Sequence, residues 1–309
     1  MSIKIVFMGT PEFSVPTLDS LIKNKFNILK VYTQPPKKSK RGQKVNASPI
    51  EEFCKKAEVS FCTPEKLSNN EEFEIFKNLS PDIVIVVAYG QIIPKSFLKI
   101  PKFGFINIHA SLLPKWRGAA PIQRAIMNGD KRIGASIMKI EEKLDTGPIL
   151  ASKEFDLDQN ITHGEIEKKL SIIGADLLIK SLQDLERGNS KFIEQIHSDA
   201  TYAKKIDKKE GRIDWKIGAP KIIGKINGLF PSPGAFFSFN GERYKILKAE
   251  IGNGMGEFGE VISDNLEIAC GNNQTIKILE IQREGKNPQK ISEFMLGSKI
   301  KKGSMIPNV

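Results

Sequence analysis

The chain has 309 residues, of which 40% are hydrophobic and 27% charged, as in a globular protein long enough for two domains. It has no apolar run long enough for a transmembrane helix, and its three cysteines (Cys54, Cys62, Cys270) and three histidines show no metal-ligand spacing. The formal net charge of +11 favours polyanionic partners such as nucleic acid or anionic lipid, although a lysine-rich genome would produce the same excess.

The N-terminus enters a strand pattern directly at Ile3–Phe7, without a basic and apolar leader or an Arg/Ser-rich transit segment. An odd number of cysteines suits a reducing compartment. We therefore expect a cytoplasmic protein.

The N-terminal half alternates predicted strands and helices. The apolar run 3–8 ends at Gly9-Thr10-Pro11 and precedes a helix over about 14–23, but a single glycine does not make a dinucleotide-binding fingerprint. A strand is predicted at 27–33, a helix at 49–57 capped by Ser48, a strand at 59–62 and a helix at 70–78. This order is typical of an α/β fold.

Residues 82–88 contain six consecutive apolar residues after Asp82, which predicts a parallel strand buried on both faces. The loop Tyr89–Pro94 follows at its C-terminal end. Open α/β sheets bind ligands at that edge, so this loop is a candidate binding segment, although a plain strand-to-helix turn has the same pattern.

A basic segment follows the second predicted strand. Residues 34–44 contain two prolines, Gly42 and no acidic residue, together with the basic residues Lys37, Lys38, Lys40, Arg41 and Lys44. Such a segment cannot build a core, which predicts an exposed, mobile loop without an element of its own. By itself it is most simply a solvated run of charge.

The chain is organised around Phe105–Gln123. Its first residues predict the end of a buried strand, on which Asn107 and His109 share a face because they are two residues apart. Ser111–Pro114 predicts an apolar turn with a hydroxyl at its mouth, and a helix follows from Ile122 to Met127.

Residues 135–140 and 149–155 predict a hairpin with Asp145 in its connection. Asn107, His109 and Asp145 together could orient an imidazole and stabilise an oxyanion. Each residue alone also has a structural explanation, as a core histidine, a turn asparagine or the start of an Asp-Thr-Gly turn.

In the C-terminal half, Thr162 caps a predicted helix over 163–187, and 189–206 is predicted as a linker. A helix at 219–228 is followed by predicted strands at 234–239, 244–251, 257–263, 266–269 and 275–282. Short strands separated by glycine and asparagine predict a small OB-like β-barrel, a fold that often binds RNA.

The stretch that contains Asn107, His109, Ser111–Pro114 and Arg117–Gln123, together with Asp145, resembles the signature of the folate-dependent formyltransferases. The Arg117–Gln123 segment and the C-terminal half are most similar to the members that act on methionyl-tRNA. The segment around 202–215 is similar to the domain junction of that family, so the resemblance extends over essentially the whole chain.

The resemblance implies a Rossmann-like formyltransferase domain at 1–188, a linker at 189–206 and an OB-like tRNA-binding domain at 207–309. It implies transfer of the formyl group of 10-formyltetrahydrofolate, as co-substrate, to the α-amine of methionine on initiator methionyl-tRNA, for translation initiation. No metal and no membrane partner are implied, and we expect a monomer.

The resemblance also assigns roles to residues. Asn107 and protonated His109 would donate hydrogen bonds to the oxyanion, while Asp145 would hold the imidazole and help to remove a proton from the attacking ammonium. The implied folate-binding residues are Tyr89, Gly90, Gln91, Ile93, Ser111, Leu112, Leu113 and Pro114. The implied tRNA-binding residues are Lys37, Lys38, Lys40, Arg41, Lys44 and Lys205, with the basic loop ordering over the acceptor end.

Two other function classes compete with this one. A related folate enzyme could formylate a small amine, such as glycinamide ribonucleotide or a nucleotide sugar, or hydrolyse the formyl group; the small purine enzyme would lack the C-terminal barrel. A non-catalytic RNA-binding protein with a decayed α/β domain is disfavoured by the intact set Asn107, His109 and Asp145. Transfer of labelled formyl to a panel of acceptors distinguishes them.

Overall fold

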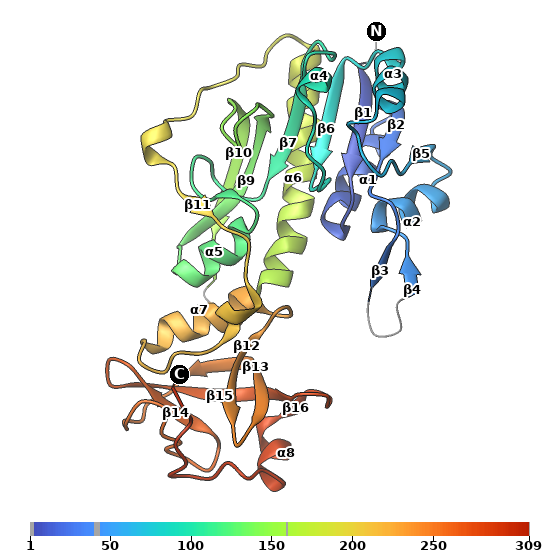
Figure 1. Ribbon diagram of the computed structural model, residues 1–309. Coiled ribbons are helices and arrows are strands. Elements are labelled where there is room, and N and C mark those ends of the chain that lie inside the picture. The colour runs from blue at the N-terminus through green and yellow to red at the C-terminus, as the bar shows by residue number, and fades with distance from the viewer. Residues whose placement is uncertain (1–2, 40–43, 159, 309) are drawn as a thin grey trace. The chain divides into compact units, whose positions relative to one another are not determined.

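The computed structural model describes residues 3–39, 44–158 and 160–308, and these form two compact units (Figure 1). One unit consists of Met1–Gly118, Gly134–Phe155 and Glu167–Tyr202. The other consists of Ala119–Ile133, Asp156–Ile166 and Ala203–Val309, so it includes two segments that come from within the range predicted as the N-terminal domain. The division at residues 188 and 207 stays a prediction.

In the described part of the chain, the first unit is built on a seven-stranded sheet with the order β10-β9-β7-β6-β1-β2-β5. The pairs β1·β2, β1·β6, β2·β5 and β6·β7 are parallel, and β7·β9 is antiparallel. The strands are β1 (Lys4–Gly9), β2 (Asn27–Tyr32), β5 (Phe61–Cys62), β6 (Ile83–Val87), β7 (Phe105–His109), β9 (Arg132–Lys139) and β10 (Ile149–Asp156). The predicted α/β sheet is thus confirmed, with an antiparallel edge.

Strand β6 lies at the centre of this sheet and is buried along its whole length, as its apolar run predicted. Successive side chains point to opposite faces, so β6 contributes to two hydrophobic cores. Ile83, Ile85 and Val87 pack in one core, and Val84 and Val86 pack in the other.

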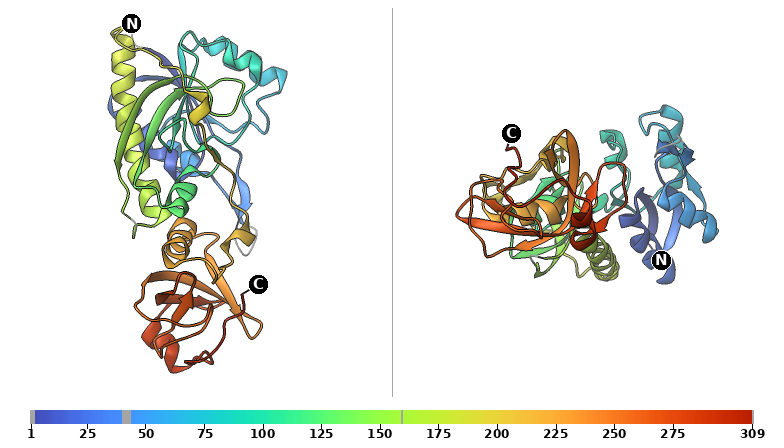
Figure 2. Two further views of the ribbon diagram at one scale, coloured as in Figure 1. Left: turned by 90° about the vertical axis from the view of Figure 1, so that its left-hand side faces the viewer. Right: turned by 90° about the horizontal axis from the view of Figure 1, so that it is seen from below.

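Helices cover both faces of the sheet. The first core contains residues from α1 (Val15–Lys23), α2 (Pro49–Lys56) and α6 (His163–Glu186), and the second from α3 (Asn70–Leu79) and α4 (Lys95–Leu98). Helix α6 packs against β7, where a Cβ atom at Gly174 would lie 2.7 Å from Cγ2 of Ile108 (Figures 1 and 2). None of the helices in the described residues is long and apolar enough to cross a bilayer.

Two predicted helix caps are present. The Ser48 hydroxyl accepts a hydrogen bond of 3.0 Å from the Glu51 backbone N–H at the start of α2. The Thr162 hydroxyl accepts a longer one, of 3.5 Å, from the Glu165 backbone N–H at the start of α6, and the Glu165 carboxylate accepts one of 2.8 Å from the Thr162 N–H. These side chains satisfy backbone donors that the first turn of a helix leaves free.

The prediction for the basic segment was wrong in one respect. Strands β3 (Lys37–Ser39) and β4 (Lys44–Asn46) pair antiparallel, so the segment has an element of its own. The hydrogen bonds of a strand ladder come from the backbone and need no apolar side chains. Residues 40–43, and with them Lys40 and Arg41, lie outside the described residues.

The second unit contains an antiparallel sheet with the order β12-β13-β15-β14, and β16 pairs with β15. The elements are α7 (Ala219–Leu229), β12 (Ala235–Phe239), β13 (Glu242–Ile251), β14 (Glu267–Cys270), β15 (Gln274–Arg283), β16 (Gln289–Lys290) and α8 (Ile291–Leu296). Their apolar side chains form one core with Trp215. The fold class is therefore a mixed α/β sheet followed by a C-terminal antiparallel half-barrel.

The strand predicted at 257–263 does not form. Only isolated bridges join Glu260 to Met305 and Val261 to Ile268, since Gly259 has a φ of +84° and interrupts the extended backbone. Five further elements were not predicted from the sequence: α4, α8, β16 and the two-residue strands β8 (Arg117–Gly118) and β11 (Tyr202–Ala203), which pair with each other.

Helix α5 (Pro121–Asn128) belongs to the second unit and packs closely on α7. A Cβ atom at Gly224 would lie 3.0 Å from the Ile126 carbonyl oxygen, and one at Gly228 would lie 3.1 Å from that of Gln123. The glycines of α7 therefore permit a close approach of the two helices.

Candidate active site

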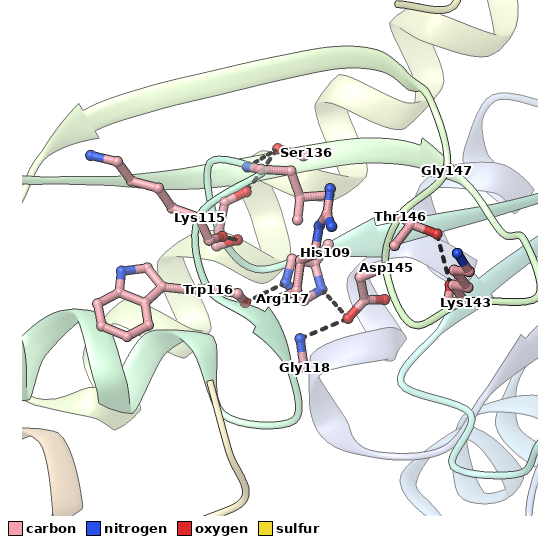
Figure 3. Close-up of polar contacts among 12 residues, drawn as sticks. His109, Lys115, Trp116, Arg117, Gly118, Ser136, Lys143, Asp145, Thr146 and Gly147 are labelled. Carbon is pink, nitrogen blue, oxygen red and sulfur yellow. Dashed lines mark hydrogen bonds and ion pairs between the residues drawn. The ribbon is translucent and has the colours of Figure 1, made fainter. Parts of the chain in front are cut away.

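The imidazole of His109 lies at the C-terminal end of β7 and is buried, with 6% of its surface exposed. Its Nε2 atom lies 2.9 Å from the carbonyl oxygen of Trp116. Because a carbonyl can only accept, Nε2 carries the proton of this hydrogen bond. The other nitrogen, Nδ1, faces the Asp145 carboxylate, and Figure 3 shows the ring between its two partners.

Asp145 lies between β9 and β10, where the sequence predicted it. Its Oδ2 atom is 3.7 Å from Nδ1 of His109 and accepts a hydrogen bond of 2.8 Å from the backbone N–H of Gly118 (Figure 3). The distance to the imidazole is too long for a direct hydrogen bond, so the pair interacts through charge or through a bridging group. Asp145 has a φ of 51°, an uncommon left-handed conformation for a residue other than glycine.

Asn107 lies two residues before His109 on β7 and is half-buried. It is paired with Val86 of β6 and Met138 of β9, so the backbone is fixed from both sides. Its side-chain amide forms no hydrogen bond with the described residues. The amide is thus a donor free to bind an incoming group.

The Nε2 atom of His109 is hydrogen-bonded to the Trp116 carbonyl, and Nδ1 faces the Asp145 carboxylate without a direct hydrogen bond. A direct hydrogen bond from this ring to an oxyanion therefore requires the ring to leave Trp116 or Asp145. In the observed arrangement, the Asn107 amide is a donor without a hydrogen bond to the described residues, and the Asp145 carboxylate is an acceptor held by the Gly118 N–H.

The turn Ser111–Pro114 is held by two hydrogen bonds with Ser136 of β9. The Ser136 hydroxyl donates to the Ser111 carbonyl at 2.8 Å and accepts from the Leu113 N–H at 3.1 Å. The Ser111 hydroxyl, predicted at the mouth of the turn, is instead buried and donates to the Lys115 carbonyl at 2.6 Å. Because the Ser111 hydroxyl already donates within the turn, it is not a free donor. Leu112 packs against Gly134.

The loop Tyr89–Ile93 is likewise tied to the fold by its side chains. Tyr89 is buried in the second core, and the Gln91 amide donates to the Pro64 carbonyl at 2.9 Å and accepts from the Leu67 N–H at 3.2 Å. Gly90 has a φ of +81° and passes close to the Gln34 amide. Ile92, which was not predicted as a site residue, is 94% exposed, so its apolar side chain is available to a ligand.

A cavity of about 770 Å³ lies in the first unit, within the usual size of a small-molecule site. Its lining includes Lys95, Lys99, Arg117, Lys143, Thr146 and His197, and also Glu141, Glu142 and Glu194. None of the eight predicted folate-binding residues belongs to this lining. Thr146 and Arg117 are the chain neighbours of Asp145 and Gly118, which places the cavity beside the candidate catalytic residues.

Arg117 belongs to the Arg117–Gln123 segment of the motif, but no role was predicted for it. Its guanidinium is buried and donates to Oε1 of Gln195 from Nε at 3.1 Å and from Nη2 at 2.7 Å. Gln195 lies in the predicted linker, where its sequence context carries no signal for such a contact.

Of the predicted tRNA-binding residues, Lys37, Lys38 and Lys44 lie in β3 and β4, and Lys205 is exposed in the second unit. Arg124 of α5 holds the backbone next to Lys205, donating to the Lys204 carbonyl at 3.1 Å and 3.0 Å. The structure does not bring β3 and β4 together with Lys205 in one unit. No group of three or more His, Cys, Asp or Glu side chains that could hold a metal ion occurs in the described ranges.

Comparison with known proteins matches both parts of the chain to family models. Residues 3–182 match the model described as Formyl transferase, and residues 205–299 match that described as Formyl transferase, C-terminal domain. The chain is 58% identical over 310 residues to the methionyl-tRNA formyltransferase of Pelagibacter ubique (strain HTCC1062), covering 100% of both chains.

Two solved structures share the fold at low sequence identity. A sugar 3N-formyl transferase, WlaRD, solved in the presence of dTDP and 5-N-formyl-THF, is 22% identical with a TM-score of 0.68 over 93% of this chain and 100% of its own. HypX from Aquifex aeolicus, in complex with tetrahydrofolic acid, is 17% identical with a TM-score of 0.62; 98% of this chain is covered, but it spans only 49% of HypX.

Proposed function

Because this chain belongs to the formyl transferase family, we propose that it is a methionyl-tRNA formyltransferase. The enzyme moves the formyl group of 10-formyltetrahydrofolate to the α-amine of methionine esterified to initiator tRNA, giving formylmethionyl-tRNA for translation initiation. The observation that carries this proposal is the 58% identity to a methionyl-tRNA formyltransferase over the full length of both chains.

The chemistry requires a donor for an oxyanion and an acceptor for a proton. The amine nitrogen attacks the formyl carbon, and the new N–C bond gives a tetrahedral oxyanion. When the oxyanion collapses, the bond between that carbon and N10 of the folate breaks; the amine loses a proton and N10 gains one.

Asn107 supplies the oxyanion donor, since its amide is uncommitted and its backbone is fixed on both sides. One such donor is typically worth about 2.7–4 kcal/mol of barrier. His109 adds a second donor when Nε2 exchanges the Trp116 carbonyl for the oxyanion.

Asp145 accepts the proton of the attacking amine, directly or through a water molecule. The Gly118 N–H holds its carboxylate in place, so the acceptor does not have to reorganise during the reaction. Because this carboxylate lies 3.7 Å from Nδ1 of His109, it also stabilises a positive charge that develops on the ring during the reaction.

The folate is proposed to lie along Tyr89, Gly90, Gln91 and Ile93 and the turn Ser111, Leu112, Leu113 and Pro114. The side chains of Tyr89, Gln91 and Ser111 are committed to the fold, so these residues offer mainly backbone groups and shape. The exposed Ile92 offers apolar surface, and the cavity lined by Arg117 and Thr146 offers volume for the rest of the co-substrate.

The tRNA is proposed to bind to the basic residues Lys37, Lys38, Lys40, Arg41, Lys44 and Lys205, with residues 207–309 as its second binding domain beyond the linker 189–206. The net charge of +11 supports a polyanionic partner. We propose that the enzyme acts in the cytoplasm as a monomer.

The test is the transfer of labelled formyl from 10-formyltetrahydrofolate to a panel of acceptors. The panel contains initiator methionyl-tRNA, uncharged tRNA, glycinamide ribonucleotide and an amino sugar nucleotide, with a folate-only control for hydrolysis. We expect transfer to methionyl-tRNA alone. Preferred formylation of a small amine, or release of formate without an acceptor, would overturn the proposal.

A further inference from the structure

Arg117 has an unusual environment for a buried cation. Its side chain is 2% exposed, and no carboxylate among the described residues forms an ion pair with it. Its partners are neutral: Oε1 of Gln195, which accepts from Nε and Nη2, and Nδ1 of His197, which lies 3.0 Å from Nη2. A buried guanidinium is tolerated only when its donors are satisfied, so Gln195 and His197 hold this side chain in one orientation.

Gln195 connects this guanidinium to the loop that carries Asp145. Its amide nitrogen donates to the carbonyl oxygen of Asp145 at 3.0 Å and to that of Gly147 at 2.7 Å. Arginine can only donate and carbonyls can only accept, so just one orientation of the Gln195 amide satisfies all four contacts. The side chain is 6% exposed, and its hydrogen-bonding capacity is fully used.

The contacts close into a ring through Asp145. Gln195 holds the backbone of Asp145, and the Gly118 N–H holds its carboxylate. Gly118 is the chain neighbour of Arg117, which in turn holds Gln195. The same loop is packed tightly at Gly147, where a Cβ atom would lie 2.0 Å from the Lys139 carbonyl oxygen. Asp145, in its left-handed conformation, is therefore fixed at its backbone and at its carboxylate.

We propose that Gln195 is a positioning residue for the formyl transfer and that Arg117 fixes Gln195 in this role. Gln195 does not touch the reacting atoms; it holds the Asp145 backbone so that the carboxylate faces His109. A displacement of about 1 Å in a catalytic group can cost roughly 100-fold in rate, which gives the scale of the effect. This proposal rests on the proposed function, because it assigns Asp145 the proton-accepting role.

The test variant is Gln195→Glu. The new carboxylate still accepts both hydrogen bonds from Arg117 and adds an ion pair, so the buried guanidinium stays satisfied. The two N–H donors to the Asp145 and Gly147 carbonyls are lost, and oxygen faces oxygen. The variant thus keeps the contact with Arg117 and removes the contacts with the loop that carries Asp145. Gln183→Glu on the exposed face of α6 is the matched control, since it makes the same change away from the site.

The measurements are the single-turnover rate of formyl transfer to methionyl-tRNA at saturating substrates, the folate Kd, and thermal melting. For Gln195→Glu we expect a rate loss of about 100-fold, a folate Kd within about threefold of the wild type, and a retained cooperative melting transition. Gln183→Glu should behave as the wild type. A Gln195→Glu enzyme with wild-type turnover would overturn the positioning role.

A double-mutant cycle with Asp145→Asn tests whether the effect passes through Asp145. In the Asp145→Asn background, Gln195→Glu should cost less than about fivefold, because there is no carboxylate left to position. A loss of about 100-fold in both backgrounds would show that Gln195 supports the fold and not Asp145. Arg117→Lys, which keeps the charge but loses the two-donor contact, provides the same cycle if Gln195→Glu does not fold. Wild-type enzyme that transfers no formyl to methionyl-tRNA would refute the proposed function, whereas failure of the cycle alone refutes only the role of Gln195.

Discussion

The carboxylate of Asp145 accepts a hydrogen bond of 2.8 Å from the backbone N–H of Gly118. The contact joins the loop between β9 and β10 to the segment that follows the turn at Ser111–Pro114. It leaves the same carboxylate oxygen 3.7 Å from Nδ1 of His109. Because the anchor is a backbone group, the side chain of Asp145 can be changed in charge without removing the anchor.

Replacing Asp145 by Asn therefore tests the charge at nearly constant shape. The amide oxygen can still accept from Gly118, but it cannot take a proton from the amine. We expect a fall in single-turnover rate of about 10²–10⁴-fold, with the folate Kd changed by less than about threefold. Both are measured with purified enzyme and methionyl-tRNA. Turnover close to that of the wild type would remove Asp145 from the proposed mechanism.

In the second unit, Arg124 grips the Glu210 carboxylate with two hydrogen bonds, of 2.6 Å and 3.0 Å. These hydrogen bonds are the main reason why the pKa of Glu210 is lower than its usual value. A lowered folded-state pKa means that the stabilisation is present above the unfolded-state pKa and is lost as pH falls through the folded-state pKa. Acid should therefore weaken this contact.

We expect Glu210→Gln to lower the free energy of unfolding by about 1 kcal/mol at neutral pH, after allowance for the partial exposure of the pair. The difference from the wild type should shrink as pH falls below about 4. Urea unfolding at several pH values measures it, with Glu284→Gln as an exposed control. A difference that does not depend on pH would show that the charge of Glu210 contributes nothing.

Cys54 and Cys270 are buried and Cys62 is half-buried, and burial raises the pKa of all three thiols. It raises the pKa of Cys54 and of Cys270 to about 11, and it is the main cause that raises the pKa of Cys62 to about 12. The thiolate is the reactive form, and at pH 8 only about one in 1,000 or fewer of these groups would carry it. We expect Ellman's reagent to label the folded enzyme at least about 100-fold more slowly than the enzyme in guanidinium chloride. Rapid labelling of one thiol in the native enzyme would contradict the burial.

The basic residues around β3 and β4 are expected to contact tRNA phosphates. Replacing Lys37, Lys38, Lys40 and Arg41 by alanine should raise the KM for methionyl-tRNA and flatten its salt dependence, since each lost phosphate contact removes about 0.7–0.9 from the log–log slope. The KM for folate should not change. Formylation kinetics at several salt concentrations provide the measurement.

The matched control for this variant replaces the exposed lysines Lys25, Lys56, Lys66 and Lys77 by alanine. It removes the same charge from the first unit. Equal effects of the two variants would show that the basic segment acts only through the overall positive charge of the protein and not through specific contacts with the tRNA.

Local pattern was enough to predict the central sheet. The apolar run after Asp82 predicted β6 because a strand buried on both faces needs apolar side chains at every position. Strands β3 and β4 lie in a segment that was predicted as a loop, because their hydrogen bonds come from the backbone and the residues Lys37–Ser39 carry no periodic hydrophobic pattern.

The candidate site was only partly predictable. The spacing of Asn107 and His109 placed both on one face of a strand, but each of these residues and Asp145 also had a structural explanation, and only the family resemblance favoured the catalytic one. The contact of Arg117 with Gln195 spans 78 residues and depends on how the segment after α6 returns to the sheet. No local pattern around Gln195 reports such a contact, so its segment was predicted as a linker.

The most direct test of the proposed function is a single-turnover experiment that follows both products at once. Enzyme loaded with 10-formyltetrahydrofolate is mixed with initiator methionyl-tRNA, and formylmethionyl-tRNA and tetrahydrofolate are quantified from the same quenched samples. The proposed function predicts that the two products form in a 1:1 ratio at the same rate and that neither forms without the charged tRNA. Tetrahydrofolate released at an equal rate in the absence of methionyl-tRNA would contradict it.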